Sequence, residues 1–138
     1  MQSRKSDSID WETAPAENFT GRAWFGPMAV PGDTSALNVL GVGFEPGART
    51  HWHSHPGGQV LYCVSGQGLV ANEHGERTTL TTGDSVQIPS GEVHWHGASR
   101  GAPMVHLSIT MAATEWTDRP VTDDEYQGDD SPSETVDG

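Results

Sequence analysis

Residues 47–66 read GARTHWHSHPGGQVLYCVSG and contain histidines at three alternating positions, His51, His53 and His55. Successive side chains of a β-strand point to opposite faces, so an extended chain turns all three imidazoles to the same side. Four residues after His55, Gln59 offers an amide oxygen. Glycine stands at both ends of the stretch, where a strand must turn. The stretch therefore predicts a strand that carries several potential metal ligands on one face.

A second stretch contributes two more imidazoles. Residues 83–96 read GDSVQIPSGEVHWH and include His94 and, two positions later, His96. By the same alternation, both side chains lie on one face of a strand. Two strands that each send imidazoles to one face can assemble a metal site between them.

The spacing of these residues resembles the two sequence motifs of the cupin superfamily. The pattern G-x5-H-x-H-x3-(E)-x6-G is matched at Gly47, His53, His55, Gln59 and Gly66, and G-x5-P-x-G-x2-H is matched at Gly83, Pro89, Gly91 and His94. The 16 residues between the motifs, 67–82, fit the short hairpin link of small bacterial cupins. The resemblance covers about residues 19–126. It is closest to the manganese-dependent hydroxynitrile lyase-like cupins of bacteria.

The resemblance implies a metal bound by His53, His55, Gln59 and His94. If His51 and His53 were the first pair instead, the next ligand would fall on glycine, which has no donor side chain. Glutamine stands where the common cupin pattern has glutamate, so the ligand set carries no negative charge. We expect a divalent ion with open coordination positions; manganese is implied by the resemblance, and iron, nickel, cobalt and zinc are the alternatives.

The remaining chain shows short strands separated by turns. Turn signals recur at intervals typical of an all-β sandwich or barrel, and no long stretch has a helical apolar period. We predict an all-β, single-domain cupin β-barrel, also called a double-stranded β-helix or jelly roll. Residues 1–17 are expected to form a flexible arm, 18–126 the cupin domain and 127–138 an acidic disordered tail. We expect an opening strand over residues 18–28 and a turn at residues 65–68, and Thr122 with Glu125 predicts a capping box.

Catalytic and pocket roles are assigned to further residues from two observations. These are the strand face on which alternation places each side chain and the position of each residue in the motifs. His96 is expected beside the metal as a general base or acid, with His106 as a second catalytic candidate. The alternative for both is a buried, hydrogen-bonded histidine that supports a ligand. A small apolar substrate pocket is expected from inward-facing residues: Leu40, Val42, Phe44, His51, Leu61 and Thr110.

Composition limits the class of partner. The chain has 138 residues and a formal net charge of -12, with 19 acidic and 7 basic residues. Binding to nucleic acid or to an anionic membrane surface needs a cationic surface, so neither partner is expected. A single cysteine excludes an internal disulfide, and the first residues carry no apolar run typical of a signal or anchor. We expect a cytoplasmic protein that acts on a small molecule, as a homodimer or a higher homo-oligomer.

Three functions compete at this point. In the first, the metal acts as a Lewis acid on a small carbonyl or hydroxy compound, as in the reversible cleavage of a cyanohydrin that the resemblance implies. In the second, iron at the same ligands activates oxygen, as in a non-haem dioxygenase. In the third, the domain binds a small molecule without turnover. The sequence favours the first and leaves the other two open.

Overall fold

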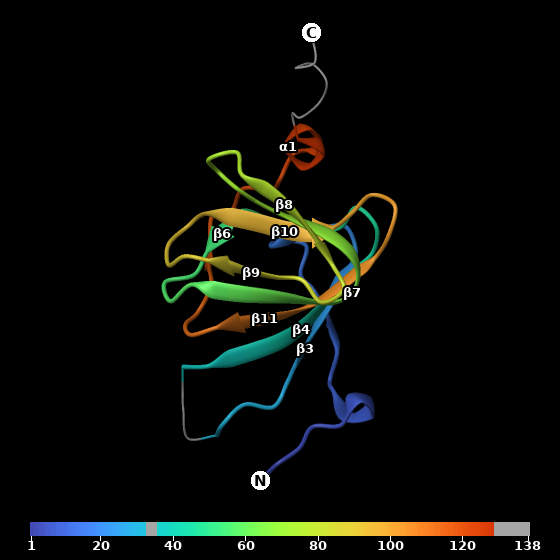
Figure 1. Ribbon diagram of the computed structural model, residues 1–138, viewed down its shortest axis with the longest axis vertical. Coiled ribbons are helices and arrows are strands. Elements are labelled where there is room, and N and C mark those ends of the chain that lie inside the picture. The colour runs from blue at the N-terminus through green and yellow to red at the C-terminus, as the bar shows by residue number, and fades with distance from the viewer. Residues whose placement is uncertain (33–35, 129–138) are drawn as a thin grey trace, which may run out of the picture.

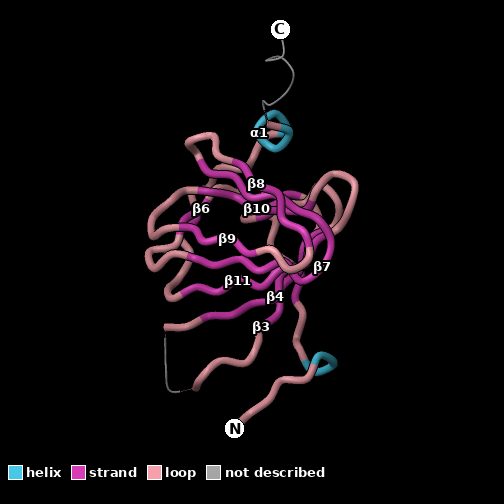
Figure 2. The backbone as a smooth tube through the Cα atoms, in the orientation of Figure 1, coloured by secondary structure: helices cyan, strands magenta, loops and turns pink. Residues whose placement is uncertain are grey.

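The fold is described from a computed structural model, which covers residues 1–32 and 36–128. Within these residues the elements, in chain order, are η1 (Ser6–Ser8), β1 (Glu12–Thr13), β2 (Phe19–Thr20), β3 (Ala23–Pro27), β4 (Asn38–Phe44), β5 (Arg49–Thr50), β6 (His53–Ser54), β7 (Gln59–Asn72), β8 (Arg77–Thr81), β9 (Ser85–Ile88), β10 (His94–Ala98), β11 (Met104–Thr110), β12 (Glu115–Trp116) and α1 (Asp123–Gln127). The predicted all-β class is confirmed (Figure 2).

Two antiparallel sheets share the long strand β7. Its first half pairs with β11 and β9, and its second half pairs with β10 and β8. Beyond β11 the first sheet continues through β4 and β3 to β1, and beyond β10 the second sheet continues through β5 to β2. Figure 1 shows the strands curling round one interior, with the loops that join them at both ends. This is the predicted jelly-roll barrel.

β7 corrects one expectation from the sequence. Residues 65–68 were expected to form a turn, but the strand continues through them and bends from one sheet into the other. The pairing with β11 shifts register between Val105 and His106, which marks a β-bulge. Gly66 sits at the bend with φ of 87°, and a Cβ there would lie 2.9 Å from the Cα of Met104. Glycine at this position therefore permits a bend where the sequence suggested a chain reversal.

The interior contains the side chains that alternate inward along β4 and β7. Val42, Phe44, Leu61 and Cys63 belong to one buried cluster, with Leu40 packed against it. This agrees with the inward parity expected for β4. On the opposite face of β4, glycines leave room for large rings.

The N-terminal segment lies on the outer face of β3 and β4 instead of leaving the domain. A Cβ at Gly41 would lie 2.8 Å from the Trp11 ring, and β1 pairs with β3. Glu12 and Thr13 are therefore part of the sheet, with Ile9 and Trp11 packed on it, so the attachment to the domain begins before the boundary expected at residue 17. The expected opening strand over residues 18–28 is also divided, because β2 and β3 belong to different sheets.

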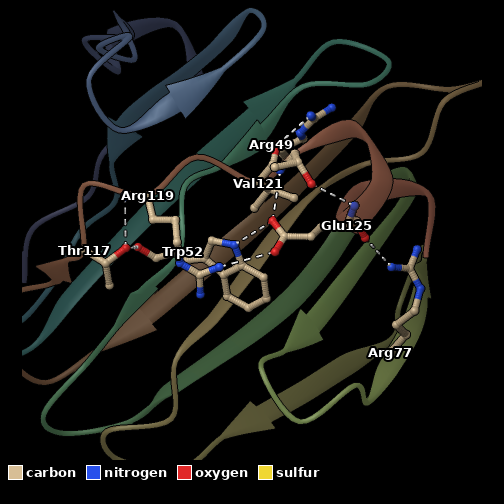
Figure 3. A network of polar contacts seen from close by, with 8 residues as sticks. Arg49, Trp52, Arg77, Thr117, Arg119, Val121 and Glu125 are labelled. Atoms are coloured by element: carbon tan, nitrogen blue, oxygen red, sulfur yellow. Dashed lines mark hydrogen bonds and ion pairs between the residues drawn. The ribbon is translucent and has the colours of Figure 1, made fainter. Parts of the chain in front are cut away.

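The C-terminal segment packs on the outer face of the second sheet. Thr122 and Glu125 form the predicted capping box of α1. Glu125 Oε1 accepts a 3.2 Å hydrogen bond from Nε1 of Trp52, and Arg119 lies 3.3 Å from Oε2 (Figure 3). Tyr126 donates a 2.6 Å hydrogen bond to the carbonyl of Ala98. These contacts join α1 to the strands behind the histidines.

Two further expectations concern a membrane-spanning helix and the acidic tail. Among the described residues, no helix is long and apolar enough to cross a membrane. The expected acidic tail, 127–138, falls outside them except for its first two residues, Gln127 and Gly128.

Candidate metal centre

Three strands, β6, β7 and β10, bring the expected ligands of both motifs together. β6 begins at His53, which pairs directly with His94 at the start of β10. His55 follows β6, and Gln59 begins β7. Every side chain of this group is buried, with at most 4% of its surface exposed. The predicted ligands are therefore adjacent, inside the barrel.

The distances between the rings show a compact cluster. The ring centroid of His53 lies 5.0 Å from that of His55, 4.4 Å from that of His94 and 5.1 Å from that of His96. The rings of His55 and His94 are 5.5 Å apart. His106 joins the group from β11, with its ring centroid 4.7 Å from that of His96.

In two of the rings, Nδ1 is held by a hydrogen bond to a backbone carbonyl oxygen. Nδ1 of His53 lies 2.8 Å from the carbonyl oxygen of His51, and Nδ1 of His94 lies 2.9 Å from that of Glu92. A carbonyl oxygen only accepts, so each Nδ1 carries the proton and donates. Each Nε2 of the neutral ring is left with a lone pair turned into the cluster. This tautomer is the one a metal-binding imidazole needs.

Gln59 places an oxygen in the same region. Its Oε1 lies 2.9 Å from Nε2 of His94, and its Nε2 donates a 2.8 Å hydrogen bond to Oγ of Ser108. With the proton of His94 on Nδ1, two lone pairs face each other across 2.9 Å. A cation bound near both atoms would remove that repulsion, which is a physical reason for a metal here.

Further ring nitrogens, including Nδ1 of His106, are buried without a hydrogen-bond partner among the described residues. Nε2 of His55 and Nε2 of His96 have no hydrogen-bond partner among the described residues. A buried polar atom without a hydrogen-bond partner is energetically unfavourable, so we expect each of these nitrogens to contact an ion, a water or a ligand. The donor set fits a divalent cation because such an ion would pair with these buried nitrogens.

The electrostatics keep these rings neutral. Burial, together with the charge of the neighbouring His94, lowers the pKa of His55 to about 4. Burial, followed by the charges of neighbouring histidines, also holds the pKa of His53 and His96 well below the usual value. Neutral imidazole is the form that binds metal, so the cluster is prepared for an ion at neutral pH.

The tightest group of donors differs in one member from the set expected from the sequence. Nitrogens of His53, His94 and His96 all lie within 4.8 Å of one another, and these three histidines could hold a metal ion. His53 and His94 belong to both sets. His96 takes the place in this group that the sequence motif assigns to His55.

His96 and His106 form a pair beside this group. Nδ1 of His96 lies 3.0 Å from Nε2 of His106. Burial lowers the pKa of His106 to about 4. A hydrogen-bonded pair of neutral imidazoles next to ligand nitrogens can pass or hold a proton.

His51 lies apart from the cluster, contrary to the expected common face. The strand is interrupted between β5 and β6, so the alternation does not run through residues 51–53. Burial lowers the pKa of His51, whose charged neighbours are Arg49 and Asp118. Among the described residues, its ring makes no contact with the other histidine rings. The place expected for His51 in the substrate pocket stays a prediction.

The other expected pocket residues come from β4, β7 and β11, and their role in a pocket stays a prediction. The Phe44 ring lies 5.5 Å from that of His106 and 6.0 Å from that of His96. Thr110 pairs with Gln59 across β11 and β7, and Leu61 is fully buried. Leu40 and Val42 come from β4, on the far side of β11. Leu40, Val42, Phe44 and Leu61 pack in one apolar cluster, here called the apolar wall, and Phe44 brings it next to His96 and His106.

Two neighbours of the ligands were not identified from the sequence. The ring of Trp116, on β12, lies 4.7 Å from that of His53. Ser108 contacts Gln59. Ser108 could have been found from its alternation with His106 and Thr110. Trp116 has no such pattern, because the pairing of β12 with β6 is a tertiary contact.

Comparison with known proteins gives the family. The sequence model of the Cupin domain family matches residues 42–110, and this range includes every expected metal ligand. The chain is a cupin. A relative from Granulicella tundricola, the (R)-mandelonitrile lyase, is 39% identical to this cupin over 117 residues, covering 82% of this chain and 88% of the relative.

Solved structures agree with the fold of this cupin. A cupin-like protein from Thermotoga maritima has a TM-score of 0.77 and 38% identity, over 83% of this chain and 90% of that one. The polyketide cyclase RemF from Streptomyces resistomycificus has a TM-score of 0.72 at 17% identity, over 98% and 96% of the two chains. The second likeness shows the fold alone.

Proposed function

We propose that this cupin is a metal-dependent lyase that cleaves a small cyanohydrin reversibly to an aldehyde and hydrogen cyanide. The ligands would be His53, His55, Gln59 and His94, and the ion would be divalent, with manganese as the first candidate. The observation that carries the proposal is the buried, uncharged donor set around Gln59. The similarity to a mandelonitrile lyase supports the reaction class.

Neutral ligands suit Lewis-acid chemistry. Three imidazoles and one amide leave the full charge of a divalent ion in place, whereas the glutamate of the common motif would reduce it. The ion, when bound, would supply Lewis acidity toward the oxygen of a small hydroxy or carbonyl compound. His53 and His94 are fixed by their backbone carbonyls, so their lone pairs need no rearrangement to bind it.

His96 is the proposed base. Its Nε2 is buried without a partner in the described part of the chain, and Nδ1 faces His106. If Nδ1 carries the proton and donates to His106, Nε2 has the lone pair and accepts the hydroxyl proton of the cyanohydrin. The electrons of that O–H bond form the carbonyl, the C–C bond breaks, and cyanide leaves with its electron pair. Cyanide then takes the proton back from His96, so the base is restored and the products are an aldehyde and hydrogen cyanide.

The apolar wall would hold the organic group of the substrate. Phe44 lies next to both His96 and His106, and Val42 and Leu61 are buried in the same cluster. An aryl or alkyl group placed against this wall loses water-exposed apolar surface, which favours binding. The reacting carbon is then next to the polar donors.

A direct experiment compares oxygen and metal requirements. We would purify the protein without chelators, measure its metals, and follow cleavage of each enantiomer of mandelonitrile by benzaldehyde absorbance, in air and under nitrogen. The proposal expects one divalent ion per chain and equal rates in both atmospheres. Turnover of organic substrates only in air would point to the dioxygenase, and binding of aldehydes without turnover would point to a binding module.

A further inference from the structure

Ser108 contacts Gln59 from the side opposite the metal centre. Its side chain is buried, with 9% exposed, and its Oγ accepts the 2.8 Å hydrogen bond from Nε2 of Gln59. The other end of the amide, Oε1, lies 2.9 Å from Nε2 of His94. We infer that Ser108 is a positioning residue that keeps the amide oxygen of Gln59 turned toward the metal ligands. The inference rests on the proposed function, because it concerns the same ion.

Orientation matters because the two ends of an amide are chemically different. The oxygen can bind a cation, whereas the NH2 group only donates hydrogen bonds. A half-turn about the last side-chain bond exchanges the two ends within almost the same volume. When a cation takes the lone pair on Nε2 of His94, no acceptor faces the centre, so an NH2 group turned that way would be left unpaired in the interior, where Gln59 is only 4% exposed. Ser108 provides that acceptor on the side away from His94.

The register of the strands explains why a residue of β11 has this role. Ser108 pairs with Leu61 and Thr110 pairs with Gln59 in the ladder between β11 and β7. Ser108 is therefore the diagonal neighbour of Gln59, on the inward face that His106 and Thr110 share, and diagonal neighbours are within reach of long side chains. β11 thus contributes to the centre without supplying a ligand.

The same chemistry predicts when Ser108 would not be needed. A glutamate at position 59 has oxygen at both ends, so a half-turn of its carboxylate changes nothing at the metal. The requirement for a hydrogen-bond acceptor at position 108 is tied to glutamine. The two positions should therefore be energetically coupled in metal binding.

The experiment is a double-mutant cycle on metal affinity. Ser108→Ala and the nearly isosteric Ser108→Cys would be made in the wild type and in Gln59→Glu, with Ser108→Thr as the variant that keeps a hydroxyl. Thiol sulfur is a weak acceptor, so the cysteine variant tests the hydrogen bond with little change in volume. The readouts are the Kd for Mn2+ from chelator competition and the Tm of each metal-free form.

We expect Ser108→Ala and Ser108→Cys to raise the Kd by about 10- to 100-fold in the wild type, the range seen for residues that support a ligand. Ser108→Thr should restore most of the affinity, and in Gln59→Glu the same substitutions should change the Kd much less. An unchanged Kd in both variants, or an equal change in both backgrounds, would overturn the inference while leaving the proposed function standing. A wild type that binds no metal would overturn both.

Discussion

Gln59 is the residue on which the proposed chemistry depends most. Replacing it with glutamate adds a negative charge to the ligand set without changing its size. We expect Gln59→Glu to bind the ion about tenfold more tightly, equivalent to roughly 1.4 kcal/mol, and to turn over more slowly at saturating metal. The Kd and the rate would be measured on the same preparations. Weaker metal binding, or faster cyanohydrin cleavage, would contradict the Lewis-acid account of this residue.

His55 and His96 separate the ligand set from the proposed base. Within residues 1–32 and 36–128, both have a buried Nε2 without a hydrogen-bond partner, and both lie next to His53 and His94. His55→Ala should lose stoichiometric metal binding. His96→Ala should keep the ion with little change in Kd but lose about 10²- to 10⁴-fold in turnover, the usual contribution of a positioned base. Metal analysis and rates would decide the assignment, since the reverse pattern would make His96 the ligand.

For individual residues, the spacing of the two motifs predicted most of the histidine cluster. It placed His53, His55, Gln59 and His94 together because each is fixed by its distance from a strand end. It failed for His51, because parity holds only while a strand is continuous and the chain breaks between β5 and β6. The proton positions on His53 and His94 were not predictable, because they depend on carbonyls placed by the fold.

Among the elements, the start of α1 follows from its local sequence, whereas the bend of β7 depends on tertiary pairing. The capping box of α1 is a local signal, and the structure has it. The bend of β7 at Gly66 was mistaken for a turn, because a glycine with positive φ serves both purposes. Which purpose applies depends on the pairing partners of the strand, and these come from distant parts of the chain.

The attachment of α1 should depend on pH through Glu125. Burial alone would raise the pKa of Glu125, but hydrogen bonds from Thr122 and Trp52 and the charge of Arg119 outweigh it, so the pKa is lowered. A lowered folded-state pKa means that this stabilisation is present above the usual value of 4.5 and is lost as pH falls through the folded-state pKa. We expect the wild type to exceed Glu125→Gln in stability at neutral pH by about 0.5 kcal/mol, because glutamine keeps the capping box and loses mainly the part-exposed pairing with Arg119.

Denaturant unfolding of both proteins from pH 7 to pH 3, with the fluorescence of Trp52 and its neighbours as the signal, would test this. The difference between the two proteins should shrink below about pH 4.5, which separates Glu125 from the acid effect of the buried histidines that both share. A difference that stays constant with pH would mean that the carboxylate charge has no part in holding α1.

For the whole molecule, the outer face of β7 and β11 in the first sheet is uncharged. Its side chains on β7 and β11 are apolar and exposed or half-buried: Val60, Tyr62, Val64, Val105, Leu107 and Ile109. The chain carries a net charge of -12, so most approaches between two copies are repulsive. We propose that a second copy covers this face, since the same uncharged patch on both subunits can meet across a two-fold axis.

Tyr62→Glu should turn such a dimer into a monomer, because it would bury like charges near the two-fold axis. Thr78→Glu, which adds the same charge at an exposed position on β8, is the matched control and should remain dimeric. Light scattering after size exclusion would give the masses. A wild type that is monomeric at all concentrations tested, or equal behaviour of the two variants, would contradict the proposal.

The fold as a whole was predictable from the sequence because the alternating strands, the turns and the two motifs all indicate the same barrel. The N-terminal segment was not, because its polar composition hides the two contacts that attach it. Trp11 and Ile9 pack against Gly41 and Gly26, and a glycine on a strand gives no indication of which ring will cover it.

The central claim is that turnover depends on one ion held by the histidines and Gln59. The most direct test is a titration of Mn2+ into metal-free protein, with bound metal and the initial rate of mandelonitrile cleavage measured on the same samples. The account predicts that the rate rises in proportion to occupancy and stops rising at one ion per chain. A metal-free protein that cleaves mandelonitrile as fast as the loaded protein would contradict it.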